Sequence, residues 1–310
     1  MLKKDFLRVW DLKKEEIEAL WKRSTEYKEG RVDDQPLKGK SVGLLFEKPS
    51  TRTRLSFEVA IAQLGGYPVF ISSRDTQMIR NEPLKDTARV LSRYLDGLVV
   101  RTFSQKTLED LSLYGTVPVI NALSDLYHPA QILSDLFTVW ERKGTFEGMK
   151  IAWLGDGNNV ANSWIEAACI FPFHLVMACP KGFEPKAEIW EWAKGQAGDR
   201  LELTRDPLEA VREAQVVNTD VWASMGQEDQ AAERIKFFKK YQLNPKLLSQ
   251  ARADCLVLHC LPAHRGEEIT DEVLEGPNSV VWDQAENKMY VHKALLELYM
   301  GQGGENLVEG

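Results

Sequence analysis

The sequence has 310 residues, 44% hydrophobic and 27% charged, which is the composition of a globular protein of about two domains. Lysine and arginine number 39 against 46 aspartate and glutamate residues, so the net charge of −7 offers no general attraction for nucleic acid or anionic membranes. The four cysteines are too few for a disulfide framework and the charged start lacks a signal-peptide core, so we expect a cytoplasmic protein with reduced thiols.

Short β-branched or aliphatic runs alternate with longer amphipathic patterns from one end of the chain to the other. The runs predict strands at Ser41–Phe46, Tyr67–Ile71, Gly97–Arg101, Val117–Asn121, Lys150–Leu154, His174–Ala178, Leu201–Thr204, Gln215–Thr219, Leu256–His259 and Val280–Asp283. The spacing of apolar residues predicts helices at Arg52–Leu64, Leu84–Tyr94, Ile132–Arg142, Ala161–Phe171 and Pro185–Ala197. This alternation predicts an α/β fold of parallel β-sheets covered by helices.

Two lobes are predicted, because a charged and glycine-flanked connection over 141–148 separates the first four strands from the rest. We place the two domains at 1–144 and 145–310. Amphipathic helices are predicted near both ends of the chain, at Lys13–Tyr27 and Glu286–Met300, and the second of these can pack back on the first domain. We expect a loose tail over 301–310.

The first chemical motif is the run Ser50-Thr51-Arg52-Thr53-Arg54, which follows a predicted strand and opens a predicted helix. Free backbone N–H groups, hydroxyls and a guanidinium meet there, and this combination suits a phosphate monoester. The chain has no Gly-x-x-x-x-Gly-Lys-Ser/Thr loop, so a nucleoside triphosphate is disfavoured.

Further polar residues follow other predicted strands of the first lobe. Arg101 ends one strand, while His128 and Gln131 follow another. Ligands of parallel sheets lie at the carboxyl ends of the strands. An arginine and a histidine there can polarise a carbonyl group, and the glutamine can hold an amide.

In the second lobe, two turns follow predicted strands, and the second of them suits the charged head of an amino acid. Gly155-Asp156-Gly157-Asn158-Asn159-Val160 resembles the start of a dinucleotide-binding loop, but Val160 replaces the third glycine, so a nicotinamide cofactor is weakly supported. The run Asp220-Val221-Trp222-Ala223-Ser224-Met225-Gly226 offers Asp220 and Ser224 to an ammonium group and backbone N–H groups to a carboxylate. The basic and aromatic stretch Arg234–Tyr241 that follows is interpreted as a solvated amphipathic helix.

The segment from Cys255 to Glu268 contains four thiol or imidazole groups, so a zinc site must be considered. Cys255 and His259 lie on one predicted strand, while His259 and Cys260 face opposite sides of it, which makes tetrahedral closure awkward. We therefore predict no metal, and a thiol beside a ligand fits better.

Four motifs together resemble the aspartate/ornithine carbamoyltransferase family, and within it the ornithine carbamoyltransferases. In chain order they are Ser50-Thr51-Arg52-Thr53-Arg54, His128-Pro129-x-Gln131, Asp220-x-Trp222-x-Ser224-Met225-Gly226 and His259-Cys260-Leu261-Pro262. The resemblance implies a carbamoyl phosphate-binding domain, an ornithine-binding domain, an active site in the cleft between them and a homotrimer.

The resemblance also implies a role for each matched residue. Arg101, His128 and Cys260 would be catalytic. Carbamoyl phosphate would be bound by Ser50, Thr51, Arg52, Thr53, Arg101, His128, Gln131, Cys260, Leu261, Lys288 and, from a neighbouring subunit, Gln77. Ornithine would be bound by Asn159, Asp220, Ser224 and Met225. Lys288 stands where the family usually has an arginine, and it either faces the same ligand or points to solvent at the start of the last helix.

The implied reaction carries the carbamoyl group of carbamoyl phosphate to the δ-amine of L-ornithine, as a step of arginine biosynthesis, without a metal or an organic cofactor. Aspartate carbamoyltransferases share the phosphate motif but read carboxylates with an Arg-x-Gln segment, where this chain has Asp220 and Ser-Met-Gly. Acetylornithine and putrescine are alternative acceptors. A non-catalytic two-lobed binding protein is the alternative from another class.

Overall fold

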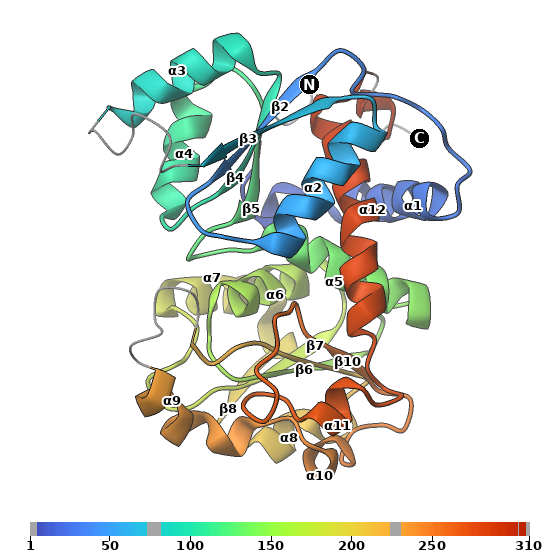
Figure 1. Ribbon diagram of the computed structural model, residues 1–310. Helices are drawn as coiled ribbons and strands as arrows, with labels where there is room; N and C mark the ends of the chain where they lie inside the picture. The colour runs from blue at the N-terminus through green and yellow to red at the C-terminus, as the bar shows by residue number, and fades with distance from the viewer. Residues whose placement is uncertain (1–4, 73–81, 224–230, 303, 308–310) are drawn as a thin grey trace. The chain divides into compact units, whose positions relative to one another are not determined.

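The computed structural model describes residues 5–72, 82–223, 231–302 and 304–307 (Figure 1). Contacts divide the chain into two compact units. Unit 1 comprises Met1–Ser134 and Glu286–Gly310, and unit 2 comprises Asp135–Ala285. Within the described ranges, the strands form two parallel five-stranded sheets, one in each unit, as the sequence predicts.

Unit 1 is built on a sheet with the strand order β1-β5-β4-β2-β3. Its strands are β1 (Asp5–Phe6), β2 (Ser41–Phe46), β3 (Tyr67–Ser72), β4 (Gly97–Arg101) and β5 (Val119–Leu123). Its helical elements are η1 (Val9–Asp11), α1 (Lys14–Lys28), α2 (Thr51–Gln63), α3 (Leu84–Tyr94), α4 (Gln105–Tyr114), the start of α5 (Pro129–Lys143), most of α12 (Val281–Met300) and η7 (Gly304–Leu307). The strands β4 and β5 are buried at every residue, which explains why their residues are apolar apart from Arg101 and Asn121.

Unit 2 is built on a sheet with the strand order β10-β9-β6-β7-β8. Its strands are β6 (Lys150–Leu154), β7 (His174–Ala178), β8 (Leu201–Thr204), β9 (Val216–Thr219) and β10 (Leu256–Leu258). Beyond the rest of α5 and the start of α12, its helical elements are α6 (Asn159–Ile170), α7 (Ala187–Ala197), η4 (Gly198–Arg200), α8 (Pro207–Val211), α9 (Ala231–Phe238), η6 (Lys239–Tyr241), α10 (Pro245–Leu248) and α11 (Asp271–Leu274). One apolar core joins this sheet to α8, α10 and α11 through side chains such as Ala152, Val217 and Val273.

Several predicted elements differ from the structure, among them one strand, the end of another strand and the tail. The strand predicted at Val280–Asp283 is wrong, because Val281–Asp283 are the first residues of α12 and Gln284 N–H donates to Val280 O at 2.8 Å. Two adjacent valines suit a strand, but the helical pattern that follows them continues back through this run. Cys255 and His259 both lie outside β10, and the tail predicted as loose contains the 3₁₀ turn η7.

The division between the units falls inside two helices rather than in a loop. It lies after Ser134 within α5 and after Ala285 within α12, whereas the sequence suggests a boundary near residue 145. A boundary inside a helix leaves no glycine, proline or charge signal in the sequence, since the helix continues through it. Among the described residues, no helix is both long enough and apolar enough to cross a lipid bilayer.

Candidate active site

Each sheet has one switch point, at which the strands that come later in the chain are added on the opposite side of the first ones. In unit 1 this point lies between β2 and β4, and in unit 2 between β6 and β9. Loops diverge at the carboxyl ends of two such strands and leave a crevice that commonly holds the ligand. Phe46 of β2 pairs with Arg101 of β4, so the loops after these two strands start side by side. The chemical motifs therefore lie where the topology places ligands.

The first of these loops leads into the amino end of α2, where Ser50 is the capping residue. Ser50 Oγ accepts a hydrogen bond from Thr53 N–H at 3.3 Å. The first turn of α2 contains no acidic residue, so the positive end of the helix dipole is left for an anion. Thr51 and Arg52 are exposed and Thr53 is buried. Arg54 turns away, because its guanidinium stacks on Phe70 at 3.5 Å and pairs with Glu58.

Lys288 is the residue that ties α12 to this helix end. Its Nζ donates to Thr53 Oγ1 at 3.1 Å and to Gln131 Oε1 at 2.8 Å. The side chain is buried at 5% exposure, so the alternative that it points to solvent is wrong. An ammonium group thus lies beside a hydroxyl of the phosphate motif and beside the amide that is expected to hold the carbamoyl group.

The loop after β5 places His128 in the same buried region. Burial lowers its pKa well below the ordinary value of 6.5, and the nearby charges of Lys288 and Arg101 lower it further. His128 is therefore a neutral imidazole at physiological pH, which can donate a hydrogen bond but supplies no charge. Arg101 is buried at 5% exposure at the end of β4 and supplies the charge instead.

The structure also buries His292 in unit 1, a histidine that the sequence does not single out. Its ring stacks on Phe57 of α2 with the centroids 3.6 Å apart, and its Nδ1 lies 2.9 Å from Ser56 Oγ. Figure 1 shows α12, in red, running alongside α2 in this part of unit 1. The pKa of His292 is also far below its ordinary value because the ring is buried and Lys288 is near.

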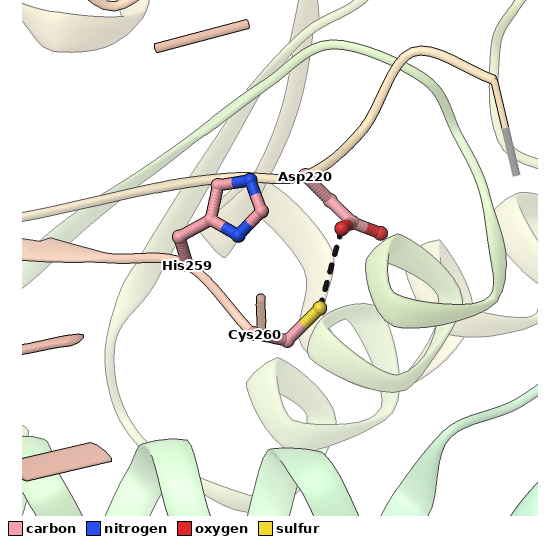
Figure 2. Close-up of side chains that lie close together, drawn as sticks. All are labelled: Asp220, His259 and Cys260. Carbon is pink, nitrogen blue, oxygen red and sulfur yellow. Dashed lines mark hydrogen bonds between the residues drawn. The ribbon is translucent and has the colours of Figure 1, made fainter. Parts of the chain in front are cut away.

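In unit 2, Asp220 follows β9 at the switch point and is held from two sides. Asn158 Nδ2 donates to its Oδ2 at 2.8 Å, and Cys260 Sγ donates to its Oδ1 at 3.2 Å, the bond drawn in Figure 2. Asn158 also caps α6, and the sequence offers a signal for it, since asparagine before a helix is a favoured cap. A carboxylate has about four lone-pair positions, and these two contacts with described residues use two of them.

The turn before Asn158 needs glycine for space. A Cβ at Gly157 would lie 2.1 Å from the backbone nitrogen of Pro185, closer than any real contact. This close approach keeps the turn against the loop after β7 and so fixes where Asn158 begins α6. Asn159, expected to bind ornithine, is the first residue of α6, and its Oδ1 lies 3.0 Å from Val160 N.

A buried ion pair lies beside Asp220. Arg234 of α9 pairs with Asp156 at 2.5 Å, packs over the rings of Phe183 and Phe238, and donates to the carbonyl of Trp222. Burial raises the pKa of Asp156 to about 6, and the nearby Asp220 raises it while Arg234 opposes the shift. The interpretation of 234–241 as solvated is thus wrong for Arg234, whose charge is buried against aromatic rings rather than in water.

Two clusters of the described residues offer three possible metal ligands each. Asp220, His259 and Cys260 have ligand atoms within 4.8 Å of one another, as do His264, Glu267 and Glu268. In the first cluster every ligand atom already has a partner: the Cys260 thiol bonds to Asp220, and the two ring nitrogens of His259 bond to Leu261 N–H and to Glu268. A metal would have to displace these bonds, so the donor set does not favour one.

The remaining site residues expected from the sequence are placed as follows. Gln77, Ser224 and Met225 lie outside the described residues. Leu261 follows Cys260 in the loop after β10 and has a positive φ of 57°. The structure thus brings together Thr53, Gln131 and Lys288 in unit 1, and Asp220 and Cys260 in unit 2.

Known proteins match the chain over almost its whole length. Residues 4–141 match the model of the aspartate/ornithine carbamoyltransferase carbamoyl-P binding domain, and residues 147–299 match that of the Asp/Orn binding domain. An ornithine carbamoyltransferase of Geobacter sulfurreducens is 56% identical over 95% of this chain and 98% of its own. The anabolic ornithine carbamoyltransferase of Pseudomonas aeruginosa is 54% identical, covering 94% of this chain and 96% of its own.

A solved structure gives the same result for the fold. The ornithine carbamoyltransferase from Pyrococcus furiosus superposes with a TM-score of 0.91 at 47% identity, covering 96% of this chain and 97% of its own. Both halves of the chain, its sequence and its fold therefore agree with the resemblance that the motifs indicate. The chain belongs to the aspartate/ornithine carbamoyltransferase family.

Proposed function

We propose that this chain is an ornithine carbamoyltransferase, which converts carbamoyl phosphate and L-ornithine into L-citrulline and phosphate. The observation that carries this proposal is the environment of Asp220. Its carboxylate is buried at the switch point of unit 2, and its hydrogen-bond partners within the described ranges are two neutral donors, Asn158 and Cys260, so no described cation neutralises it by direct contact. The α-ammonium group of ornithine would supply such a cation.

The same carboxylate weighs against other acceptors. Aspartate would bring an additional carboxylate toward Asp220, and like charges in a buried site repel. Acetylornithine carries a neutral amide in place of the α-ammonium, so Asp220 would lose its charged partner. Putrescine keeps an ammonium for Asp220 but lacks the α-carboxylate, so Asp220 alone does not separate it from ornithine. Ornithine offers a cation at this place, a carboxylate beside it and a second amine for the reaction.

Unit 1 is proposed to bind carbamoyl phosphate. Ser50, Thr51, Arg52 and Thr53 would hold the phosphate at the amino end of α2, where the helix dipole and the Arg52 guanidinium favour an anion. The buried Lys288 ammonium adds charge beside Thr53. Arg101, His128 and Gln131 would hold the carbamoyl group, with Gln131 as its amide partner.

The reaction requires the δ-amine of ornithine to attack as the neutral base. Its pKa in water is about 10.4, as for lysine, so binding must favour loss of one proton. The amine nitrogen then forms a bond to the carbamoyl carbon, and the carbonyl oxygen becomes an oxyanion. Arg101 and Thr53 would stabilise this oxyanion together with a hydrogen bond from neutral His128.

The intermediate then collapses as the carbon–oxygen bond to phosphate breaks. Phosphate leaves with the bonding electron pair, and Arg52 would bind the added charge. A second proton passes from the attacking nitrogen to the leaving phosphate, so the nitrogen becomes the neutral urea nitrogen of citrulline and the phosphate leaves as its monohydrogen dianion. Cys260 and Leu261 are proposed to flank the reacting amine. None of these steps forms a covalent bond to the enzyme.

The chain is further proposed to assemble as a homotrimer with shared sites. The support is an apolar surface on unit 1 at the edge strand β3: Tyr67 and Phe70 on the strand and Leu55 and Val59 on α2 are exposed. A large exposed apolar group at a sheet edge is a common protein interface. Gln77, which the resemblance assigns to the site of a neighbouring subunit, follows β3 in the sequence and lies outside the described residues.

Two further assignments rest on relatives and on sequence. The relatives from Pseudomonas aeruginosa and Pyrococcus furiosus are named anabolic, which supports a place in arginine biosynthesis. The cytoplasmic location stays a prediction from the sequence.

The deciding experiment is an acceptor panel with the purified protein. Carbamoyl phosphate is supplied with ornithine, acetylornithine, putrescine or aspartate, and the carbamoylated product and the released phosphate are both measured. We expect citrulline and phosphate in equal amounts from ornithine and little product from the other three. Carbamoyl phosphate alone controls for its spontaneous hydrolysis. Product from another acceptor at a higher kcat/KM would overturn the assignment, and no product from any acceptor would favour a binding protein.

A further inference from the structure

A fully buried imidazole–carboxylate pair lies next to the proposed ornithine site but takes no part in the steps above. His259 Nε2 lies 2.9 Å from Glu268 Oε1, and both side chains have no exposure to solvent. A carboxylate is removed from water only at a cost, which a hydrogen-bonded partner offsets. His259 directly precedes Cys260 in the chain, so the pair lies next to a residue of the proposed site.

The hydrogen bonds of His259 determine which ring nitrogen carries the proton. Leu261 N–H donates to Nδ1 at 2.9 Å, so Nδ1 must present its lone pair. The proton therefore lies on Nε2, which donates it to Glu268. Glu268 Oε1 also accepts from His264 N–H at 2.7 Å, so the carboxylate is itself fixed in place. The neutral Nε2–H form is the tautomer that satisfies both contacts.

The hydrogen bond that this tautomer accepts comes from Leu261, whose backbone conformation is unusual. Leu261 has a φ of 57°, in the left-handed region that residues other than glycine rarely adopt. The hydrogen bond from the Leu261 N–H to the His259 ring closes the bend of the chain at these two residues, here called the Cys260–Leu261 corner. On the other side, His259 N–H donates to Gln284 Oε1 at 3.0 Å, and Gln284 Nε2 donates to Asp135 Oδ1 at 2.7 Å. The loop after β10 is thus held at the backbone on both sides of the His259 ring.

The two neighbouring side chains have different hydrogen-bond partners. The His259 ring bonds to Glu268, while Cys260 Sγ bonds to Asp220, the bond drawn in Figure 2, and the ligand atoms of His259, Cys260 and Asp220 all lie within 4.8 Å of one another. If the Leu261 N–H lost its acceptor, the backbone could leave the left-handed region, and Cys260 would turn with it. The position of the thiol and of the Leu261 backbone therefore depends on the His259 ring.

We infer that His259 and Glu268 are positioning residues for the Cys260–Leu261 corner of the ornithine site. Glu268 selects the tautomer of His259, His259 Nδ1 holds the Leu261 N–H, and the corner keeps the Cys260 thiol beside Asp220. The pair transfers no proton in the reaction, since both ring nitrogens are engaged within the protein. This inference rests on the proposed ornithine site and adds two residues to it.

The test uses two substitutions of His259, each of which keeps the hydrogen-bonding function of one ring nitrogen and loses that of the other. His259→Asn places an amide oxygen near Nδ1, so it keeps the acceptor for Leu261 N–H and loses the contact with Glu268. His259→Gln places an amide nitrogen near Nε2, so it keeps the donor to Glu268 and loses the acceptor. We expect the KM for ornithine to rise about tenfold or more in His259→Gln and to change much less in His259→Asn.

A second readout needs no enzyme activity. The rate of alkylation of Cys260 by iodoacetamide, followed by peptide mass spectrometry, reports the position of the thiol, and the half-buried Cys169 is the internal reference. We expect His259→Gln to change the Cys260 rate several-fold and His259→Asn to leave it near that of the wild type. This contrast would persist in a chain that failed to carbamoylate ornithine, so the two proposals can fail separately.

The buried thiols of Cys179 and Cys255 report unfolding in the same experiment. If they become reactive in His259→Gln, Glu268→Gln decides the matter, because its amide oxygen can still accept from both His259 and His264. Near wild-type alkylation and ornithine KM in Glu268→Gln then support the positioning role. Equal loss in both His259 variants, or a large fall in kcat of Glu268→Gln with a lost limb of the pH profile, overturns it in favour of proton transfer.

Discussion

Lys288 Nζ lies 3.1 Å from Thr53 Oγ1, so two residues that are 235 positions apart in the chain meet at the amino end of α2. A buried ammonium in contact with the phosphate motif lowers the cost of bringing an anion there. The guanidinium that the family usually has would bind in two directions, whereas an ammonium acts as a point charge.

Lys288→Ala should therefore weaken the binding of carbamoyl phosphate by about 1.5–3 kcal/mol, the range for hydrogen bonds to charged groups. Lys288→Arg should tighten it by up to about 1 kcal/mol. Isothermal titration with carbamoyl phosphate, or with a stable phosphonate mimic, measures both. Lys293→Ala is the matched control, since Lys293 lies on the same helix and packs over Tyr27. An unchanged Kd for Lys288→Ala removes Lys288 from the site.

Asp220→Asn should raise the KM for ornithine about 30-fold to 150-fold, because a charge-assisted hydrogen bond in a buried site contributes about 2–3 kcal/mol. The binding of carbamoyl phosphate should barely change. Steady-state kinetics with each substrate varied in turn measures both effects. Asp254→Asn is the control, since it removes an exposed carboxylate of the same unit that pairs with Lys143. The opposite pattern, weaker carbamoyl phosphate binding with normal ornithine KM, would show that the units are wrongly assigned.

Buried histidines should make the protein less stable in acid. The pKa values of His128 and His292 are far below 6.5 in the folded chain, so below about pH 6.5 the unfolded chain binds protons that the folded chain does not. The free energy of unfolding then falls as the pH falls, by up to about 1.4 kcal/mol per pH unit for each histidine. Asp156, raised to about 6, contributes in the opposite sense because its folded form binds a proton first.

Replacing one histidine measures its contribution to the change of the free energy of unfolding with pH. His292→Phe keeps an aromatic ring against Phe57 and removes the titration, so the loss of stability between pH 6.5 and 5 should be shallower by about 1 kcal/mol per pH unit. Denaturant titrations at several pH values measure the slope. His174→Gln is the control, because His174 is exposed at the start of β7. Equal slopes for His292→Phe and the wild type would mean that His292 is not the group that resists protonation.

Shared sites predict that two inactive chains can repair each other. Gln77→Ala and Arg101→Ala should each be nearly inactive, yet a mixed oligomer would contain some sites with an intact Gln77 from one chain and an intact Arg101 from another. Mixing the two variants should therefore restore part of the activity, provided that the subunits exchange. Mass spectrometry verifies the hybrids, and each variant mixed with itself is the control. Verified hybrids with no gain in activity argue against a Gln77 donated across subunits.

Elements with a strong local pattern could be predicted from the sequence, and those made by distant contacts could not. The predicted strands Ser41–Phe46 and Gly97–Arg101 coincide with β2 and β4, because central parallel strands are continuous apolar runs. The two-residue strand β1 was not predicted, since it exists through its pairing with β5. Helix α4, over Gln105–Tyr114, was also missed.

The same limit applies to the site. A serine that caps α2 and an aspartate that follows β9 occupy places that a strand-by-strand reading can locate. The contacts of Lys288 with Thr53 and of Ser56 with His292 join residues more than 230 positions apart, and no local pattern encodes them. In the sequence, Glu267 and Glu268 are two adjacent carboxylates of the kind found on surfaces. In the structure, Glu268 is buried against His259.

Unit 1 takes its residues from both ends of the chain, and this has a consequence for synthesis. A ribosome releases Met1–Ser134 early, then all of unit 2, and only afterwards the segment from Glu286 that completes unit 1. Unit 2 is therefore the first whose residues are all available to fold. Lys288 reaches Thr53 last, so a message cut short after codon 285 would encode the whole phosphate motif and still leave it without its buried cation.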